Sequence, residues 1–481
     1  MKILHLCSEA FPLIKTGGLG DVAGALPSAL AGLGVDAQVM MPAYSGLKQK
    51  MRYPRKPISL GNLLGSGNVN LIRGRMPDSG VVVWLVDCPA LYQRDGGPYQ
   101  DESGQEWPDN AQRFALLSLA GAVLVEFGTL LGWQPDILHA HDWQTGLAAA
   151  YLKFREHRQC RTLFTIHNLQ HQGMFSRALL HDLRVPEHAY GLEGLEFHDH
   201  ISFMKAGLHY SDWLSTVSPT YAKEIQTSEF GHGLEGVLSH RSDRLIGILN
   251  GVDYGEWNPA TDPHIGHHYD QDTLDGKAHN KAALQKEMGL HVNPTCPLFG
   301  VVSRLADQKG LDLVADIIHQ LMDSGAQLAL LGSGDPELER QFRAAKDANP
   351  GQVGVYIGYD EALSHRIQAG SDVFLMPSRF EPCGLTQMYA LRYGTVPLVR
   401  RTGGLADTVV NLSEDGKEGT GFLFDQADAA SLAGAVRALL VAYENPVLWQ
   451  TMQQRGMKQD FGWSHAAKHY VAHYQNILHG S

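Results

Sequence analysis

Cysteine is scarce in this chain of 481 residues, and the five cysteines present are scattered without a C-x-x-C pair. Neither a disulfide framework nor a cysteine zinc site is therefore expected, and such usage fits a reducing cytoplasm. Long hydrophobic runs are missing too, because the longest, residues 114–127, contains Glu126 and is too short to span a bilayer. Residues 1–14 are typical of a first β-strand and not of a signal peptide, so a cytoplasmic protein is predicted.

An excess of positive charge is also absent. The chain has 39 Lys and Arg against 51 Asp and Glu, for a net charge of −12. This balance argues against a general binder of nucleic acid or of an anionic membrane surface. With 44% apolar and 19% charged residues, the composition is that of a globular protein, and the length predicts two or three domains.

Short apolar runs alternate with helical periods in both halves of the chain. This alternation predicts βαβ units and an α/β fold of two doubly wound, Rossmann-like domains facing across a deep interdomain cleft. The predicted strands are 3–7, 37–41, 81–86, 137–140, 162–166 and 245–249, then 298–302, 327–331, 353–357, 373–376 and 396–399. The predicted helices are 18–33, 111–127, 146–154, 218–225, 310–322, 336–346, 361–368, 385–393 and 405–412.

Two local features interrupt this alternation. Residues 69–73 and 81–86 predict a hairpin. Residues 258–297 are polar and contain several prolines and histidines, so the crossing between the domains is placed just before them, near residues 250–255.

A basic, glycine-rich turn, residues 15–21 (KTGGLGD), follows the first predicted strand and opens a helix. Lys15 and the amides of Gly17 and Gly18 would suit a diphosphate, and Asp21 would cap the helix or contact a sugar hydroxyl. A tight turn with a solvated lysine is the alternative.

A second basic turn follows the strand predicted at 298–302. Arg304 and Lys309 could neutralise two phosphates and stabilise a departing diphosphate, although a surface ion pair explains their spacing equally well. Residues 332–334 (GSG) also follow a strand, but Glu337 stands where a dinucleotide site needs its third glycine. This weakens the case for a nucleotide-dependent oxidoreductase.

Glu381 lies in a crowded loop, residues 378–386 (SRFEPCGLT), between a predicted strand and a predicted helix. Pro382 constrains the turn, and Gly384 would expose helix amides to a ligand. A carboxylate placed there can hold sugar hydroxyls or stabilise positive charge at an anomeric carbon. A simple charge at a helix start is the alternative.

Two histidine-containing segments, 139–143 (HAHDW) and 167–171 (HNLQH), end neighbouring predicted strands. Asp142, His167 and Asn168 would hydrogen-bond sugar hydroxyls. A metal site is not expected, because no H-E-x-x-H pattern or partner carboxylate accompanies the histidines.

Three aromatic residues, Tyr99, Trp143 and Phe175, could stack on pyranose rings, although aromatic side chains more often belong to the core.

Seven motifs follow one another along the chain: KTGGL (15–19), HAHDW (139–143), TIHN (165–168), NGVD (250–253), SRL with QKG (303–310), SRFEPCGL (378–385) and RRTGGL (400–405). In this order they resemble the bacterial glycogen synthase and plant starch synthase family, the ADP-glucose-dependent retaining glycosyltransferases of GT-B fold. The resemblance runs from the first strand to the terminal helix, and the start of the chain favours the bacterial type. Gly20 stands where the family commonly has alanine, a change that should loosen the turn without removing a contact.

The resemblance also implies roles for individual residues. Glu381 would be the key carboxylate, Arg304 and Lys309 would stabilise the ADP leaving group, and His167 and Asp142 would position the transferred glucose. The implied substrate-binding residues are Lys15, Gly17, Gly18, Asp21, Tyr99, Asn250, Cys383, Gly384, Leu385 and Thr386.

The implied domains are residues 1–252, residues 253–460 and a segment 461–481, whose helix (about 465–478) crosses back to the first domain. The implied reaction moves glucose from ADP-glucose to the non-reducing 4-hydroxyl of glycogen or another α-1,4-glucan, with retention and with neither metal nor cofactor. A front-face displacement and a double displacement through Glu381 both stay open. The alternatives are another sugar nucleotide or acceptor on the same fold, and a non-catalytic glucan-binding scaffold. Oligomeric state is not predicted.

Overall fold

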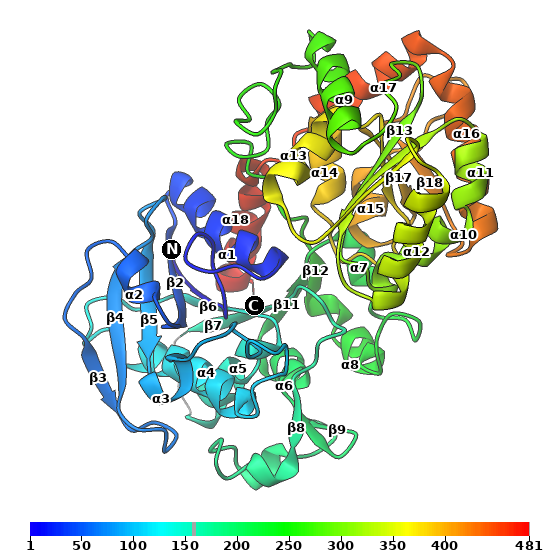
Figure 1. Cartoon of the computed structure of the whole chain (residues 1–481). Coiled ribbons are helices and arrows are strands. Elements are labelled where there is room, and N and C mark those ends of the chain that lie inside the picture. Colours follow the sequence, from blue (N-terminus) through cyan, green and yellow to red (C-terminus); the bar gives the residue numbers. More distant parts are fainter. Residues whose placement is uncertain (156–159, 481) are drawn as a thin grey trace. The chain divides into compact units, whose positions relative to one another are not determined.

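The computed structural model describes residues 1–155 and 160–480 (Figure 1). The chain divides into two compact units. The first unit comprises Met1–Gly251 and Trp463–Ser481, and the second comprises Val252–Gly462. Each unit is built around its own sheet and its own hydrophobic core.

Most of the described strands of the first unit form a nine-stranded sheet. Its strands pair in parallel, except that β4 runs antiparallel to both of its neighbours, β3 and β5. The hairpin predicted at 69–73 and 81–86 is thus confirmed. In sheet order the strands are β12 (Leu245–Gly247), β11 (Trp213–Thr216), β7 (Arg161–Ile166), β6 (Ile137–His141), β1 (Lys2–Leu6), β2 (Asp36–Pro42), β5 (Val82–Asp87), β4 (Val69–Arg75) and β3 (Ile58–Gly61).

Helices and a small second sheet complete the first unit. The sheet consists of β8 (Met174–Ser176), β10 (His200–Ser202) and β9 (Glu196–Phe197). The helices are α1 (Gly18–Gly32), α2 (Leu47–Lys50), α3 (Pro89–Tyr92), α4 (Asn110–Phe127), α5 (Leu147–Phe154), α6 (Phe203–Tyr210), α7 (Pro219–Glu224), α8 (Glu235–His240) and α18 (Trp463–His479).

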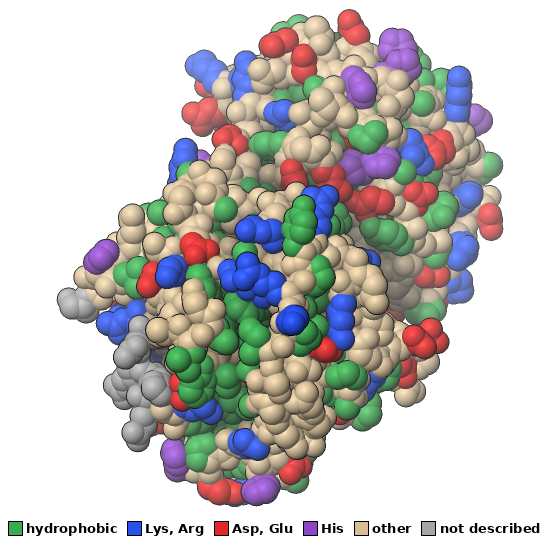
Figure 2. Space-filling view, turned by 90° about the vertical axis from the view of Figure 1, so that its left-hand side faces the viewer, with side chains coloured by type: hydrophobic (Ala, Val, Ile, Leu, Met, Phe, Trp, Pro, Cys, Tyr) green, Lys and Arg blue, Asp and Glu red, His purple; other side chains and the backbone are tan. Residues whose placement is uncertain are grey.

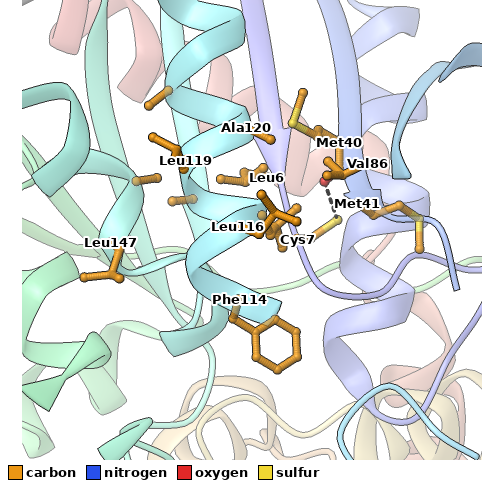
Figure 3. Close-up of a cluster of buried hydrophobic side chains, with 14 of the residues drawn as sticks. Leu6, Cys7, Met40, Met41, Val86, Phe114, Leu116, Leu119, Ala120 and Leu147 are labelled. Carbon is orange, nitrogen blue, oxygen red and sulfur yellow. Dashed lines mark hydrogen bonds between the residues drawn. The ribbon is translucent and has the colours of Figure 1, made fainter. Parts of the chain in front are cut away.

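Helix α4 is the centre of this unit's core. Its sequence is apolar on nearly every face, which is typical of a helix that packs on all sides. Figure 3 shows Leu116 of α4 on the side of Leu6 of β1 and Met40 of β2, whereas Leu119 lies on the side of α4 that faces Leu147. Residues 114–127, the longest apolar run, therefore form a buried core helix. Among the described residues, no helix combines the length and apolar character that crossing a membrane requires.

Helix α18 belongs to the first unit although it ends the chain. Its buried face, which includes Tyr470 and Tyr474, packs against α1 and against Ile3 and Ile137 of the sheet. The Tyr474 hydroxyl lies 2.7 Å from His139 Nδ1, so the helix is joined to the sheet by a buried polar contact as well.

The described strands of the second unit form a six-stranded parallel sheet with helices on both faces (Figure 1). In sheet order they are β15 (Val353–Ile357), β14 (Gln327–Gly332), β13 (Leu298–Val302), β16 (Val373–Met376), β17 (Val396–Arg400) and β18 (Phe422–Phe424). Numbered within the unit, this order is 3-2-1-4-5-6, the Rossmann order. The helices are α9 (Asp275–Glu287), α10 (Leu311–Asp316), α11 (Ile318–Asp323), α12 (Pro336–Ala348), α13 (Glu361–Gly370), α14 (Thr386–Arg392), α15 (Gly403–Thr408), α16 (Ala429–Tyr443) and α17 (Pro446–Lys458).

Helix α9 lies in the stretch 258–297 for which no element was predicted. Two of its buried positions are lysines: Lys281 pairs with Asp372 at 2.7 Å, and Lys277 donates to Thr395 at 2.6 Å. Polar residues on the buried face hide the apolar periodicity by which a helix is recognised in a sequence.

Candidate active site

The predicted site residues gather where strand order reverses in each sheet. In the first unit β1 lies between β2 and β6, and in the second β13 lies between β14 and β16. Ligands of doubly wound sheets bind at the carboxyl ends of the strands at such switch points. The segments that follow β1 and β6 carry Lys15 and Asp142, and those that follow β13 and β16 carry Lys309 and Glu381.

A partly buried ion pair occupies the switch point of the second unit. Lys309 Nζ lies 2.7 Å from Glu381 Oε2, and Ser378 donates a hydrogen bond to the same oxygen at 3.0 Å. Glu381 is only 6% exposed. Removing Lys309 would therefore leave the buried Glu381 carboxylate without its cation.

Arg304 and Lys309 line a cavity of about 220 Å³ at the same strand ends. Met376, Ser378 and Thr386 contribute to its wall. Gly310, directly after Lys309, adopts φ 63°, and a Cβ there would lie 2.2 Å from the Pro377 carbonyl oxygen. The glycine therefore lets the basic turn pack against the Glu381 loop.

The Glu381 loop also rests on a glycine pair that sequence reasoning did not assign to the site. The Gly404 amide donates to the Glu381 carbonyl oxygen at 3.0 Å, and a Cβ on Gly404 would lie 1.9 Å from the Cys383 carbonyl oxygen. The glycines at 403 and 404, which follow strand β17 directly, were the available signal.

The other predicted residues of this loop lie where it enters α14. Cys383 is buried, Leu385 is the N-cap of α14, and Thr386 Oγ1 lies 3.3 Å from Met376 Sδ. Gly384 has φ 69° and is followed by Gln387, whose side-chain amide donates to the Gly384 carbonyl oxygen at 3.0 Å. The side-chain amide of Gln387 therefore holds the main chain of the loop, since it also donates to the Cys383 carbonyl oxygen at 3.1 Å.

In the first unit, the turn that carries Lys15 is held by a carboxylate that was not predicted. Glu9, 2% exposed, accepts hydrogen bonds from the Thr16 amide at 2.5 Å and the Thr16 hydroxyl at 2.8 Å. Burial raises the pKa of Glu9, and the bonds from Thr16 oppose that rise. Lys15 itself pairs with Asp21 at 2.8 Å.

The turn ends at the N-terminus of α1, where Gly17 is the N-cap and Gly18 the first helical residue. A Cβ added to either would meet no atom within 4 Å, so space remains above these amides. Helix α1 has 15 residues and therefore a full set of N-terminal amides for an anion. At Gly20, by contrast, a Cβ would lie 3.2 Å from Lys15, so the missing Cβ lets the turn close tightly, and the expectation that Gly20 loosens the turn was wrong.

Tyr99 and Asn250 occupy the same unit. The Tyr99 hydroxyl lies 2.7 Å from Ser8 Oγ, on the segment that leads to the Lys15 turn. Asn250 is 7% exposed, and its Oδ1 has no hydrogen-bond partner among the described residues. A buried amide oxygen of this kind is a candidate contact for a ligand hydroxyl. Trp143 and Phe175 instead pack on each other and on Phe203.

Asp142 has a strained backbone and an unusual carboxyl group. Its φ and ψ are 57° and 179°, a region that almost only glycine adopts. Its Oδ1 accepts hydrogen bonds from the amides of His167, at 2.7 Å, and Asn168, at 3.3 Å. Burial raises the pKa of Asp142 to about 7, although these bonds lower it. Strain of this kind is concentrated at functional sites.

Four histidines cluster beside Asp142. His139 and His141 point to one face of β6, and His5 is the register partner of His139 on β1. His5, His139 and His141 could together hold a metal ion by distance alone. However, the two ring nitrogens of His139 contact Tyr474 and Thr165, and those of His141 contact His5 and His167. The geometry is that of a hydrogen-bonded cluster, because a metal would have to displace these contacts.

A larger cavity, about 620 Å³, lies elsewhere in the first unit and contains none of the predicted site residues. It is lined mainly by apolar side chains such as Leu119 and Phe127, with Arg155 and Arg184 at its border. On the face drawn in Figure 2, apolar side chains also gather on the surface of this unit. Size alone does not make this cavity the active site, because the convergent charged groups lie at the strand ends.

Known proteins resemble this chain over nearly its whole length. Residues 2–240 match a starch synthase catalytic domain, and residues 288–452 match glycosyl transferases group 1. A glycogen synthase of Rhodospirillum rubrum is 49% identical over 481 residues, which cover 100% of this chain and 99% of the relative. The chain belongs to the glycogen synthase family. A second member, from Paramagnetospirillum magneticum, is 50% identical over 99% of this chain and 98% of its own.

A solved structure extends the comparison to three dimensions. The catalytic domain of starch synthase IV from Arabidopsis thaliana, bound to ADP and acarbose, is 33% identical with a TM-score of 0.87, covering 99% of both chains. The glycogen synthase family relationship thus confirms the predicted family, the two Rossmann-like domains of a GT-B fold and a glycosyltransferase activity.

Proposed function

We propose that the protein transfers glucose from ADP-glucose to the non-reducing 4-hydroxyl of an α-1,4-glucan, with retention at the anomeric carbon, in glycogen synthesis. The single observation that carries this proposal is the Lys309–Glu381 pair beside Arg304 at the β13/β16 switch point. Two cations that line one cavity, one of them paired with a carboxylate, suit a diphosphate leaving group and a positively charged sugar carbon. The names of the relatives, glycogen synthase and starch synthase bound to ADP and acarbose, support this donor and acceptor.

Charge development during the reaction determines the proposed roles. As the bond between C1 and the diphosphate breaks, negative charge builds on the phosphate oxygens, where Arg304 and Lys309 stabilise it. Lys15 and the amides at Gly17 and Gly18 add positive charge for the same diphosphate. Because these groups neutralise the leaving group, we expect activity to persist in EDTA.

In the proposed mechanism Glu381 stabilises the sugar cation and does not attack it. Both Lys309 and Ser378 donate to Glu381 Oε2, and a carboxylate held by a cation is a weaker nucleophile. This favours departure and attack on the same face. Adding azide to Glu381→Ala tests the choice, since a double displacement predicts rescue with a β-glucosyl azide product and a front-face reaction predicts none.

The remaining predicted residues bind the glucose and the acceptor. Asp142 and His167 position the transferred sugar, assisted by Tyr99 and Asn250, while Asp21 holds Lys15. Cys383, Gly384, Leu385 and Thr386 shape the wall of the sugar site. We place the reaction in the cytoplasm, a location that agrees with the five buried cysteines, which form no disulfide among the described residues.

The deciding experiment incubates purified protein and glycogen with radiolabelled ADP-glucose or UDP-glucose in EDTA, and measures label in precipitated polymer. Incorporation from ADP-glucose, at least tenfold above that from UDP-glucose, is expected. Incorporation from UDP-glucose alone would replace the donor. No incorporation from either, with glycogen still bound, would favour a glucan-binding scaffold.

A further inference from the structure

Three histidines of the first unit form a continuous hydrogen-bonded chain. His5 Nδ1 lies 3.1 Å from His141 Nε2, and His141 Nδ1 lies 2.9 Å from His167 Nε2. His5 and His141 are completely buried, whereas His167, at the end of β7, is partly exposed. The chain therefore begins inside the core and ends at the switch point where Asp142 also lies.

Burial favours the neutral form of all three imidazoles. Burial lowers the pKa of His5 and of His167 to about 3. Burial, followed by the neighbouring histidines, lowers the pKa of His141 well below its ordinary value. A neutral imidazole has one N–H donor and one bare acceptor nitrogen. Each contact between two rings therefore pairs one N–H with one bare nitrogen.

This constraint leaves only two arrangements of protons along the chain. Either each ring carries its proton on Nδ1, so that His5 donates to His141 and His141 donates to His167, or each ring carries it on Nε2 and the direction reverses. The tautomer of His167 is thus coupled to that of His5 across two hydrogen bonds.

The buried end of the chain distinguishes the two arrangements. His5 Nε2 has no hydrogen-bond partner among the described residues. In the reversed arrangement this nitrogen would carry a proton, and a buried N–H without an acceptor is the rarer defect in native proteins. In the other arrangement, with each proton on Nδ1, His5 Nε2 is a bare nitrogen, and no N–H donor is left without an acceptor.

We infer that His5 and His141 are positioning residues that hold His167 as the Nδ1–H tautomer, so that it presents a hydrogen-bond donor to an oxygen of the bound sugar. This rests on the proposed function, in which His167 contacts the transferred glucose. Such positioning helps the reaction because a hydrogen-bond donor that is in place before the sugar arrives needs no reorganisation when the reaction begins. His139 lies on β6, as His141 does, but it does not belong to this hydrogen-bonded chain of histidines, because its ring nitrogens contact Tyr474 and Thr165.

The tautomer is measured by NMR on the full-length protein with ring-¹⁵N-labelled histidine, and the His167 signals are assigned by their loss in His167→Gln. The expected result at pH 7 is a protonated Nδ1 and a bare Nε2 for His167. A protonated Nε2 would overturn the inference. This readout needs no substrate, so it stands even if the proposed glucosyl transfer fails its own assay.

Variants of His141 supply the kinetic test. His141→Asn places an amide N–H near the position of Nδ1 and should keep kcat/KM within about threefold. His141→Leu, which removes the donor, should lower kcat/KM by roughly tenfold, the order of one lost hydrogen bond, and should give a mixed His167 tautomer.

The matched control is His139→Leu, which removes an equally buried imidazole from the same strand face. It is expected to keep kcat/KM within about twofold and to leave the His167 tautomer unchanged. Equal losses in the two leucine variants, without rescue by asparagine, would reduce His141 to a packing role. If His141→Leu does not fold, His5→Leu breaks the chain one step earlier, and the wild-type spectrum still decides the tautomer.

Discussion

At the scale of single residues, the proposed mechanism depends most on Glu381. Lys309 and Ser378 both donate hydrogen bonds to its Oε2, and the Glu381 side chain is almost fully buried. The loop was predicted from its crowding of special residues. The partners were not, because Lys309 and Glu381 are 72 positions apart and meet only when β13 and β16 become neighbours.

Replacing Glu381 by alanine should lower kcat by a factor of roughly 10² to 10³ while the KM for ADP-glucose changes little, because the carboxylate acts mainly on the charged transition state. Initial rates with glycogen as acceptor measure both constants, and circular dichroism checks the fold. A Glu381→Ala rate within threefold of wild type would remove the carboxylate from the mechanism.

Asp142 allows a prediction in which stability and activity separate. Its folded-state pKa of about 7 lies above the unfolded value, so the stability contributed by the protonated carboxyl is lost as pH rises toward and through 7. Asp142→Asn keeps an oxygen for the amides of His167 and Asn168 but carries no charge. The variant should be more stable than wild type at pH 8 by about 1–3 kcal/mol, and this advantage should shrink at pH 5.5.

The urea-unfolding midpoints of Asp142→Asn and of wild type at pH 8 and pH 5.5 test this stability prediction. Asp142→Asn should also have lost most of its kcat. A variant that is less stable at pH 8 than at pH 5.5, relative to wild type, would contradict the raised pKa of Asp142.

At the scale of elements, periodicity predicted many strands and helices of the two sheets, but it missed α16, although the buried face of that helix is apolar. Strands β13, β15 and β16 have the predicted bounds. The helix predicted at 310–322 is interrupted at Ile317, which separates α10 from α11. Strands β11 and β18, of four and three residues, were not predicted.

The contact between α15 and the Glu381 loop can be tested with one methyl group. Gly404→Ala should push the loop away from Gly404, because its Cβ would lie 1.9 Å from the Cys383 carbonyl oxygen. We expect a stability loss of about 1–3 kcal/mol and a fall in kcat of roughly 100-fold from the displaced Glu381. Thermal melting and initial rates are the measurements.

Gly434→Ala in α16 is the control, because its Cβ would meet only an Arg437 side-chain atom at 3.8 Å. An alanine inside a helix should leave kcat unchanged and raise stability by about 0.5–1 kcal/mol. Full activity in Gly404→Ala would show that the glycine pair does not position the loop.

At the scale of the whole molecule, buried histidines set the response to acid. Burial lowers the pKa of His5 and His167 to about 3 and of His473 to about 4, and lowers those of His139 and His141 well below the ordinary value. Stability from these neutral rings is present above pH 6.5 and is lost as pH falls through about 6.5 to 3. Asp142 and Glu9 act in the opposite direction but are outnumbered.

The melting temperature should therefore fall steadily between pH 7 and pH 4.5 at constant ionic strength. His473 lies on α18, away from the proposed site. In His473→Leu the melting temperature should fall less steeply with decreasing pH. The free energy of unfolding should change less by up to about 1.4 kcal/mol per pH unit, the effect of one proton. A melting temperature that rises on acidification, or a slope unchanged in His473→Leu, would contradict the lowered pKa values.

Much of this protein follows from its sequence alone, because the determining interactions are local. The alternation of apolar runs and helical periods predicted two Rossmann-like units, and the turns at residues 15–21 and 378–386 predicted polar groups at strand ends. These features depend on neighbours within a few residues, so they remain legible in one dimension.

Only the tertiary structure decided which distant residues meet. His5 and His141 are 136 positions apart, and Tyr474 reaches His139 over 335 positions because α18 packs on the first unit. The register of β1 against β6 and the docking of α18 make these contacts. Pairing across such separations depends on the packing of the entire sheet and its helices, for which no local pattern in the chain provides a signal.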